Sequence, residues 1–174
     1  MGLAGRGLYY ADGSKFKDKW KHTVVFCLSK TEAAVHSKLF VIIRKLGLEP
    51  SVLTRDGYGG MNVRIYNKDL FNALPKKSEA YYPRIPLAYV AGLFDGDGYF
   101  KEGRGESWVF VQASYPHLAH QVYKILSKFG PITLTSTPRP NGWLPINHVR
   151  VLKKARDSLR KTDFARYCAR LSSL

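Results

Sequence analysis

The chain has 174 residues, of which 45% are hydrophobic and 24% charged, a composition typical of a folded globular protein. Lysine and arginine total 28 against 13 aspartate and glutamate, so the formal net charge is +15. A surplus of this size in a small chain indicates a polyanionic partner, with nucleic acid ahead of an acidic membrane surface, although it also suits a basic protein that merely stays soluble.

Several other classes of protein are disfavoured. No apolar run approaches the ~18 residues that cross a bilayer, and the first residues lack the apolar region of a secretory signal. Cys27 and Cys168 lie far apart without a CxxC pattern, which excludes a zinc module and a disulfide framework. We therefore expect no membrane partner and an intracellular location, in the cytoplasm, the nucleoid or an organelle, for a protein that is not secreted.

In chain order, the first half opens with a short helix that ends at Asp12 and Gly13. Residues 17–29 have room for two strands, the second rich in β-branched and aromatic side chains. Residues 31–47 carry apolar side chains at helical spacing and stop at a glycine. Residues 51–55 and 62–66 fit two more strands, and a closing helix begins near Lys68.

The second half repeats this order. A short helix ends at Asp97 and Gly98, and residues 102–114 have room for two strands. A helix is expected at about 116–130, strands at 132–137 and 148–152, and a closing helix near Lys153. The sequence therefore predicts an α+β fold in which the order αββαββα occurs twice. Residues 1–74 form the first repeat, 75–86 the linker and 87–174 the second repeat.

Matches between the halves support a duplication. Residues 7–13 lie over 92–98 at an offset of 85, and without a gap residues 24–29 then fall on 109–114. Residues 45–47 match 128–130 after a two-residue deletion, and 63–65 match 149–151. These landmarks stay in register to within a few residues over nearly the whole chain, which chance does not explain as a set.

Both short helices carry small residues spaced four apart, which places them on one helix face. These helix-packing positions are Gly7 and Ala11 in the first helix and Gly92 and Gly96 in the second. Such spacing alone more often means plain packing, but here close packing would also bring Asp12 and Asp97 together at the helix ends. Two adjacent carboxylates repel, and a divalent cation with oxygen preference relieves the repulsion. The negative ends of the helix dipoles favour the same cation.

Residues 90–98 read VAGLFDGDG and resemble the LAGLIDADG motif of homing endonucleases, with Val90, Phe94 and Gly96 in place of a leucine, an isoleucine and an alanine. Residues 3–13 read LAGRGLYYADG and resemble a degenerate copy, in which Tyr10 replaces the first aspartate of the motif. The resemblance implies two pseudo-symmetric repeats that form saddle-shaped antiparallel sheets, with the motif helices packed at the centre. It also implies a monomer, because one chain carries both motifs, and an asymmetric target, because the halves differ.

The function implied by this resemblance is that of an intron-encoded homing endonuclease. Such an enzyme cuts both strands of a long double-stranded DNA site and leaves short 3′ overhangs, with Mg²⁺ as cofactor, Mn²⁺ as an alternative, and Ca²⁺ supporting binding without cutting. The implied metal-binding positions are Asp12 and Asp97 with the preceding Ala11 and Gly96. Two other readings stay open: an RNA maturase that binds its host intron RNA, and a DNA-binding module without catalysis. Retention of both aspartates favours the nuclease.

Basic residues near the aspartates are candidates for catalysis. Lys15 and Lys101 follow the two aspartates by a few residues and could stabilise phosphate charge, although each could equally be a solvated lysine at a strand start. The resemblance implies a peripheral polar residue just beyond the second strand, at Lys30 and Tyr115. Weaker candidates of the same type are Lys76, Lys77, Arg84 and Lys161.

Strand alternation predicts a DNA-reading face. If Val63 and Ile65 face the helices, the intervening side chains face the other way, and Val149 and Val151 impose the same division in the second half. The outward residues that could contact bases or phosphates are Asn62, Arg64, Tyr66, His148 and Arg150. Further base-reading candidates are Lys21, Thr23 and Gln112. Loop residues that could bind phosphate are Lys17, Lys19, Arg55, Lys101, Arg104 and Arg139.

Overall fold

The computed structural model describes residues 3–54, 57, 59–78, 86–101 and 103–171. The first repeat consists of α1 (Leu3–Asp12), β1 (Gly13–Asp18), β2 (Lys21–Ser29), α2 (Ala33–Lys45), β3 (Ser51–Thr54), β4 (Gly60–Tyr66) and α3 (Lys68–Ala73). The second consists of α4 (Pro86–Asp97), β5 (Gly98–Lys101), β6 (Ser107–Gln112), α5 (Pro116–Leu126), the 3₁₀ turn η1 (Ser127–Phe129), β7 (Ile132–Thr137), β8 (Ile146–Val151), α6 (Lys153–Arg160) and α7 (Asp163–Tyr167).

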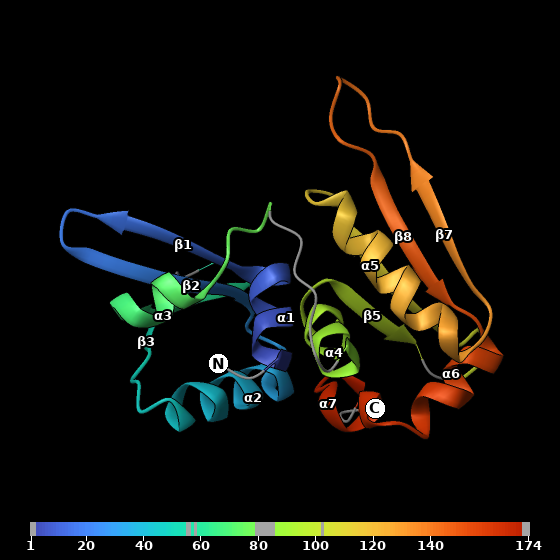
Figure 1. Ribbon diagram of the computed structural model, residues 1–174, viewed down its shortest axis with the longest axis horizontal. Coiled ribbons are helices and arrows are strands. Elements are labelled where there is room, and N and C mark those ends of the chain that lie inside the picture. Colours follow the sequence, from blue (N-terminus) through green and yellow to red (C-terminus); the bar gives the residue numbers. More distant parts are fainter. Residues whose placement is uncertain (1–2, 55–56, 58, 79–85, 102, 172–174) are drawn as a thin grey trace.

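The two sheets have the same topology. Their strand orders are β1-β2-β4-β3 and β5-β6-β8-β7, with every neighbouring pair antiparallel. The sheets lie on either side of the paired helices α1 and α4 (Figure 1). The predicted α+β fold with two antiparallel sheets and the motif helices at the centre is confirmed. The second repeat ends in two short helices, where one was predicted.

The first strand of each repeat begins four residues earlier than predicted. Strand β1 starts at Gly13 and β5 at Gly98, directly after the motif helices. The chain can reverse there without a loop because glycine has no Cβ: a Cβ at Gly13 would lie 2.6 Å from the carbonyl oxygen of Tyr9 in the preceding turn.

The hairpin that follows differs in length between the repeats. Gly13 pairs with Phe26, whereas Gly98 pairs with Phe110, so the second hairpin is one residue shorter. Strands β2 and β6 therefore match at an offset of 84. The ungapped match at 85 was wrong for these strands.

This slip of one residue matters because it moves every side chain to the opposite face of the sheet. Gln112 pairs with Asn147 in the second repeat, and the equivalent pair in the first is Leu28 with Met61. The structural counterpart of Gln112 is therefore Leu28, and not Cys27 as the ungapped match implied.

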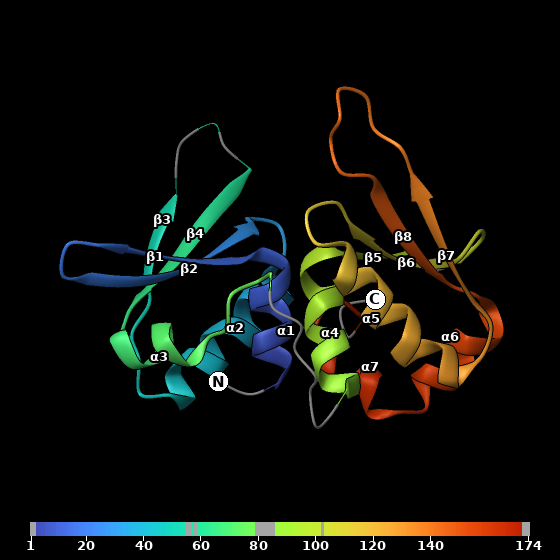
Figure 2. The same cartoon turned by 45° about the horizontal axis from the view of Figure 1, so that its top comes forward.

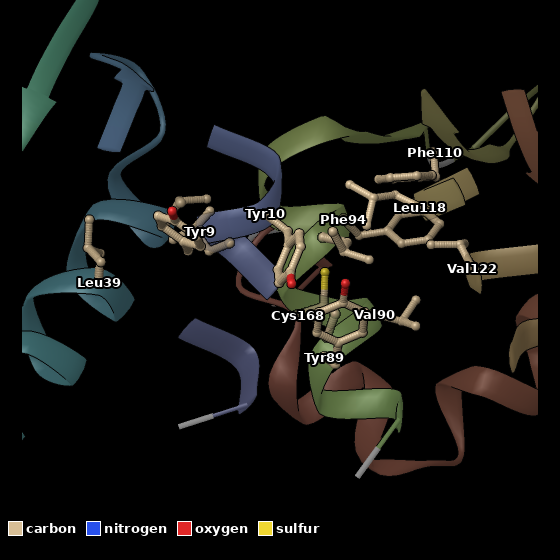
Figure 3. Close-up of a cluster of buried hydrophobic side chains, with 14 of the residues drawn as sticks. Tyr9, Tyr10, Leu39, Tyr89, Val90, Phe94, Phe110, Leu118, Val122 and Cys168 are labelled. Carbon is tan, nitrogen blue, oxygen red and sulfur yellow. The ribbon is translucent and has the colours of Figure 1, made fainter. Parts of the chain in front are cut away.

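The core fills the space between the helices and one face of each sheet. Val63 and Val149 are fully buried on this face, as strand alternation predicted, whereas Arg150 is exposed on the other. Figure 3 shows that α1 and α4 supply aromatic side chains to this core. Tyr10, which occupies the position of the motif's first aspartate, packs edge-to-face on Tyr89 with ring centroids 5.9 Å apart. Tyr10 thus contributes an apolar contact between the repeats.

None of the helices in the described ranges is long and apolar enough to cross a membrane.

Candidate metal centre and nucleic-acid interface

Helices α1 and α4 pack with their backbones in direct contact. A Cβ at Gly7 would lie 2.9 Å from the backbone nitrogen of Leu93, and one at Gly92 would lie 2.8 Å from that of Leu8. Only glycine fits at both positions, which explains the small residues predicted to pack there.

The same face continues to the carboxyl ends of the two helices. A Cβ at Gly96 would meet the Cβ of Ala11 and would lie 2.7 Å from Oδ2 of Asp12. Helices α1 and α4 lie side by side (Figure 2). Asp97 is the residue after Gly96, and it acts electrostatically on Asp12, so the helix pair brings both aspartates close together.

Burial is the largest influence on the pKa values of Asp12 and Asp97. Burial and, after it, the adjacent Asp97 raise the pKa of Asp12 to about 7, although Arg170 opposes the rise. Burial likewise raises the pKa of Asp97 to about 6, against the lowering effects of Lys77 and of a hydrogen bond from Gln112. Two desolvated carboxylates that repel each other form a site that a bound cation stabilises.

Gln112 belongs to this site and not to the base-reading face. It is only 4% exposed, and its Nε2 donates to Oδ2 of Asp97 at 2.9 Å. Its Oε1 accepts from the backbone N–H groups of Ser114 and Tyr115 at 2.8 and 3.0 Å, which fixes the orientation of the amide. In the first repeat Leu28 occupies the equivalent position, so the surroundings of the two aspartates differ.

Lys77, from the segment after α3, reaches the same site. Its Nζ donates to the carbonyl oxygen of Ala11 at 3.0 Å and lies 5.9 Å and 5.7 Å from the ring centroids of Tyr9 and Tyr115. Burial lowers the pKa of Lys77, while Asp97 and Asp12 raise it. A lysine that the sequence ranked among the weaker candidates therefore places its charge beside both aspartates.

Arg170 was missed by the sequence analysis. Its guanidinium donates to the carbonyl oxygens of Asp95, Gly98 and Gly96 at 2.7, 2.7 and 3.0 Å. It therefore satisfies carbonyls at the carboxyl end of α4, which lack partners within the helix. The only signal in the sequence is that a basic residue follows the closing helices of each repeat, Lys77 in the first and Arg170 in the second.

Asp95 has a structural role beneath the site. It is fully buried, forms an ion pair with Lys38 of α2, and accepts from Sγ of Cys168 at 3.3 Å and from the backbone N–H of Arg170 at 3.1 Å. Arg170 in turn forms an ion pair with Glu32 of the first repeat. The pairs Lys38–Asp95 and Glu32–Arg170 thus cross between the repeats.

The catalytic assignment of Lys15 is contradicted. Lys15 pairs with the buried Val24, so it lies on the helix side of its sheet. Its Nζ donates to the carbonyl oxygens of Phe71, at 2.8 Å, and Leu74. Lys15 therefore stabilises the carboxyl end of α3.

The other candidates around the metal site are placed as follows. Lys101 is exposed at the end of β5, and Lys30 is exposed in the turn after β2. The carbonyl oxygens of Ala11 and Gly96 accept hydrogen bonds from Lys77 and Arg170, so a metal bound at either oxygen would lie beside a positive charge. Lys161 is exposed after α6, Lys76 is exposed after α3, and Arg84 lies outside the described residues.

The open face of the first sheet carries the predicted residues of β4. Asn62, Arg64 and Tyr66 pair with Cys27, Val25 and Thr23 of β2, so all six side chains share this face. Thr23 is only 2% exposed, which contradicts its assignment as a base reader. In the second sheet, His148 and Arg150 pair with Thr135 and Thr133 on the corresponding face.

The lysines and arginines assigned to loops are mostly at hairpin ends. Lys19 lies in the β1–β2 turn, Arg104 in the β5–β6 turn and Arg139 in the β7–β8 loop, whereas Lys21 is the exposed first residue of β2. Lys17 is a strand residue and not a loop residue, because β1 begins early. Arg55 lies outside the described residues.

The donor set fits a hard divalent cation. Within the described ranges, no three or more His, Cys, Asp or Glu side chains form a group that could by itself hold a metal ion. Mg²⁺ is commonly held by one or two carboxylates and completes its shell with substrate phosphates and water. Asp12 and Asp97 supply two partly buried carboxylates, which suits such a site.

Comparisons with known proteins agree with this geometry. The family model described as a LAGLIDADG-like domain matches residues 84–161. No curated protein sequence matches the chain. A variant of I-DmoI in complex with its target DNA in the presence of Mn is similar in structure, with a TM-score of 0.68, 16% identity, and coverage of 97% of this chain and 96% of that one.

Two further structures extend the comparison. I-DmoI in complex with DNA and Mn has a TM-score of 0.61 at 18% identity, with 99% of each chain covered. Full-length DUF199/WhiA from Thermatoga maritima has a TM-score of 0.63 at 14% identity, with 98% of this chain and 59% of that one covered. Residues 84–161 are therefore similar in sequence to the LAGLIDADG-like domain family, and nearly the whole chain shares the two-repeat fold of I-DmoI.

Proposed function

We propose that the chain is a site-specific endonuclease that uses a divalent metal to cut both strands of a long, asymmetric DNA target and leaves short 3′ overhangs. The observation that carries this proposal is the pair of desolvated carboxylates, Asp12 and Asp97, at the abutting ends of α1 and α4. A chain of net charge +15 that only bound DNA would lose affinity by holding two carboxylates toward the phosphates. A bound metal ion would neutralise the two carboxylates, which removes this loss of affinity and explains why both are present.

Asp12 and Asp97 would hold the metal, with Mg²⁺ as the proposed cofactor, Mn²⁺ as an alternative and Ca²⁺ as an ion that supports binding without cutting. When bound, such an ion polarises the scissile phosphate and lowers the pKa of an attacking water. Structures of I-DmoI with DNA contain Mn or Ca, which supports a divalent ion here.

Three other residues orient the two aspartates or place positive charge beside them. Gln112 holds the carboxylate of Asp97 in one orientation through its own fixed amide. Lys77 places a positive charge beside both aspartates, where it can stabilise charge that develops on a phosphate oxygen. Arg170 is a positioning residue, because it holds the end of α4 from which Asp97 projects.

The proposed partner is double-stranded DNA lying across the open faces of both sheets. Arg64 and Arg150 occupy matched places on these faces and can contact bases or phosphates. One chain supplies both carboxylates, so a monomer suffices, and the unequal surroundings of Asp12 and Asp97 suit a target whose halves differ.

A cleavage assay on a randomised duplex library tests the proposal. Staggered cuts enriched at one long site with Mg²⁺, and absent with Ca²⁺ or EDTA, are expected. Asp12→Asn and Asp97→Asn should each bind the selected duplex and fail to cut both strands. Cutting at the wild-type rate by both variants would remove this assignment.

The principal alternative is a protein of this fold that binds nucleic acid without cleaving it. The similarity to DUF199/WhiA shows that the fold is not confined to proteins named as endonucleases. Binding without cutting under every metal condition would favour this alternative, and host intron RNA, the ligand of a maturase, would be the next probe.

A further inference from the structure

Lys77 and Arg170 occupy matching places in the two repeats. Each follows the closing helices of its own repeat and donates to the carbonyl oxygen that precedes an aspartate of the pair. Lys77 donates to Ala11 and Arg170 to Gly96, both at 3.0 Å. Ala11 and Gly96 are themselves counterparts in the two motif helices. The two cations are therefore structural counterparts.

The second contact of each cation differs in charge. Each cation reaches the N-cap residue of the second helix in the opposite repeat. Arg170 forms an ion pair with Glu32, the N-cap of α2, whereas Nζ of Lys77 lies 5.7 Å from the ring centroid of Tyr115, the N-cap of α5. A tyrosine ring attracts a cation without a formal negative charge. Glu32 thus neutralises Arg170, while the contact with Tyr115 does not neutralise Lys77.

His117, in the first turn of α5, contacts the backbone of the same lysine. Burial lowers the pKa of His117, and a hydrogen bond with the backbone of Lys77 opposes this effect. A bond that favours the protonated ring is one in which the ring donates to a carbonyl oxygen. Nε2 of the ring is shielded from water, which is costly for a residue that only packs. The corresponding position of α2 is Ala34, so the repeat does not need histidine there to fold.

The start of α5 is itself fixed to the metal site. Gln112 donates to Asp97 through Nε2 and accepts from the backbone N–H of Tyr115 through Oε1. The rings of Tyr115 and His117 then pack edge-to-face, with centroids 6.0 Å apart. One short stretch of the second repeat therefore holds Asp97 on one side and the backbone of Lys77 on the other.

We propose that His117 is a positioning residue, which anchors the backbone of Lys77 so that the ammonium group stays beside Asp12 and Asp97. The inference rests on the proposed function, in which Lys77 stabilises charge on a phosphate oxygen. A lysine side chain loses much rotamer freedom when it is held in one place. A fixed backbone shortens the mobile part of Lys77 and lowers that loss.

The first measurement needs neither metal nor DNA. It is the NMR signal of the ε-methylene group of Lys77, in EDTA, from protein that carries isotope-labelled lysine. The rings of Tyr9 and Tyr115, whose centroids lie 5.9 and 5.7 Å from Nζ, should separate this signal from those of exposed lysines. Lys77→Arg lacks the signal and so identifies it. His117→Ala should move it toward the exposed lysines, and an unchanged signal would overturn the inference.

The second measurement is the rate of cutting in a single turnover, with the selected duplex and saturating protein in Mg²⁺. His117→Ala should slow cutting about 10–100-fold, the effect of a misplaced catalytic group. Its affinity for the duplex in Ca²⁺ should stay within about twofold of the wild type, since His117 acts through Lys77 and not on DNA. A loss of affinity as large as the loss of rate would overturn the inference.

Conservative variants and matched controls separate positioning from packing. His117→Gln keeps a donor for the carbonyl oxygen and should restore most of the rate and the NMR signal, whereas His117→Leu fills the space without a donor and should behave like His117→Ala. His120→Ala and Tyr123→Ala remove exposed rings from the same helix and should change neither readout. Full activity and an unchanged Lys77 signal in His117→Leu would show that the ring only packs, which would overturn the inference.

A double-mutant cycle tests whether His117 acts through Lys77. Adding His117→Ala to Lys77→Ala should slow cutting no further, because no ammonium group is left to position. Additive losses would overturn the inference and leave the proposed function intact. A wild type that binds duplex DNA and never cuts it would instead overturn the proposed function, and the NMR signal of Lys77 would still decide whether His117 anchors the lysine.

Discussion

The substitution Asp12→Asn separates what this carboxylate does for folding from what it does for the proposed chemistry. Burial and the neighbouring Asp97 raise the pKa of Asp12 from 3.8 to about 7. The folded state thus disfavours the charged form. The stability associated with Asp12 is greatest below pH 3.8 and is lost as the pH rises through 7.

The magnitude follows from the shift. About three pKa units correspond to about 4 kcal/mol, and since Asp12 keeps some contact with water and shares the repulsion with Asp97, we expect removal of the charge to recover about 2 kcal/mol at pH 8. For a chain of this length that is a rise of about 4–8 °C in melting temperature. Near pH 4 the folded wild type is already protonated at Asp12, so the two proteins should melt at nearly the same temperature.

The assay is thermal unfolding in EDTA at both pH values, repeated with Mg²⁺ at pH 8. Mg²⁺ should raise the melting temperature of the wild type and leave Asp12→Asn nearly unchanged. Asp157→Asn is the matched control, because its carboxylate is half exposed on α6 and should change stability by less than about 0.5 kcal/mol. A melting temperature for Asp12→Asn at or below that of the wild type in EDTA at pH 8 would refute the desolvated pair.

Three further substitutions test other parts of the structure. Gly92→Ala inserts a methyl group 2.8 Å from the backbone nitrogen of Leu8 and should cost about 3 kcal/mol by denaturant unfolding, so a neutral result would contradict the backbone contact of the motif helices. Lys38→Met leaves Asp95 buried without its cation and should cost about 3–5 kcal/mol, which a double-mutant cycle with Asp95→Asn would show to be a coupled loss. Gln112→Leu reproduces the first repeat's side chain beside Asp97 and should slow cutting of one strand about 10–100-fold, so that nicked plasmid accumulates, whereas equal slowing of both strands would contradict a local role.

The proximity of Asp12 and Asp97 could be predicted from the sequence because its determinants are local. Helix periodicity places Gly7 and Ala11 on one face and fixes Asp12 at the helix end, and the repeat supplies the partner. The outward direction of Arg150 was predictable for the same reason, since alternation along a strand needs no knowledge of the rest of the fold.

The supporting residues could not be predicted, because they depend on the length of one hairpin and on distant contacts. One missing residue in the second hairpin moved Gln112 from the open face to the side of Asp97. Lys15 follows Asp12 closely in sequence, yet alternation turns it to the far side of the sheet. Arg170 reaches the end of α4 only through the path of the chain after α7, which no local pattern specifies.

The ion pairs Lys38–Asp95 and Glu32–Arg170, which cross between the repeats, limit how this protein could be recombined. Lys38 and Glu32 of the first half find their partners, Asp95 and Arg170, only in the second. A chimera that joins either half to a half from another protein would bury one member of each pair without its counterion, even if the glycine contacts of the motif helices were preserved. The two halves share one pattern but are not interchangeable, and any exchange of halves must carry these four side chains as a set.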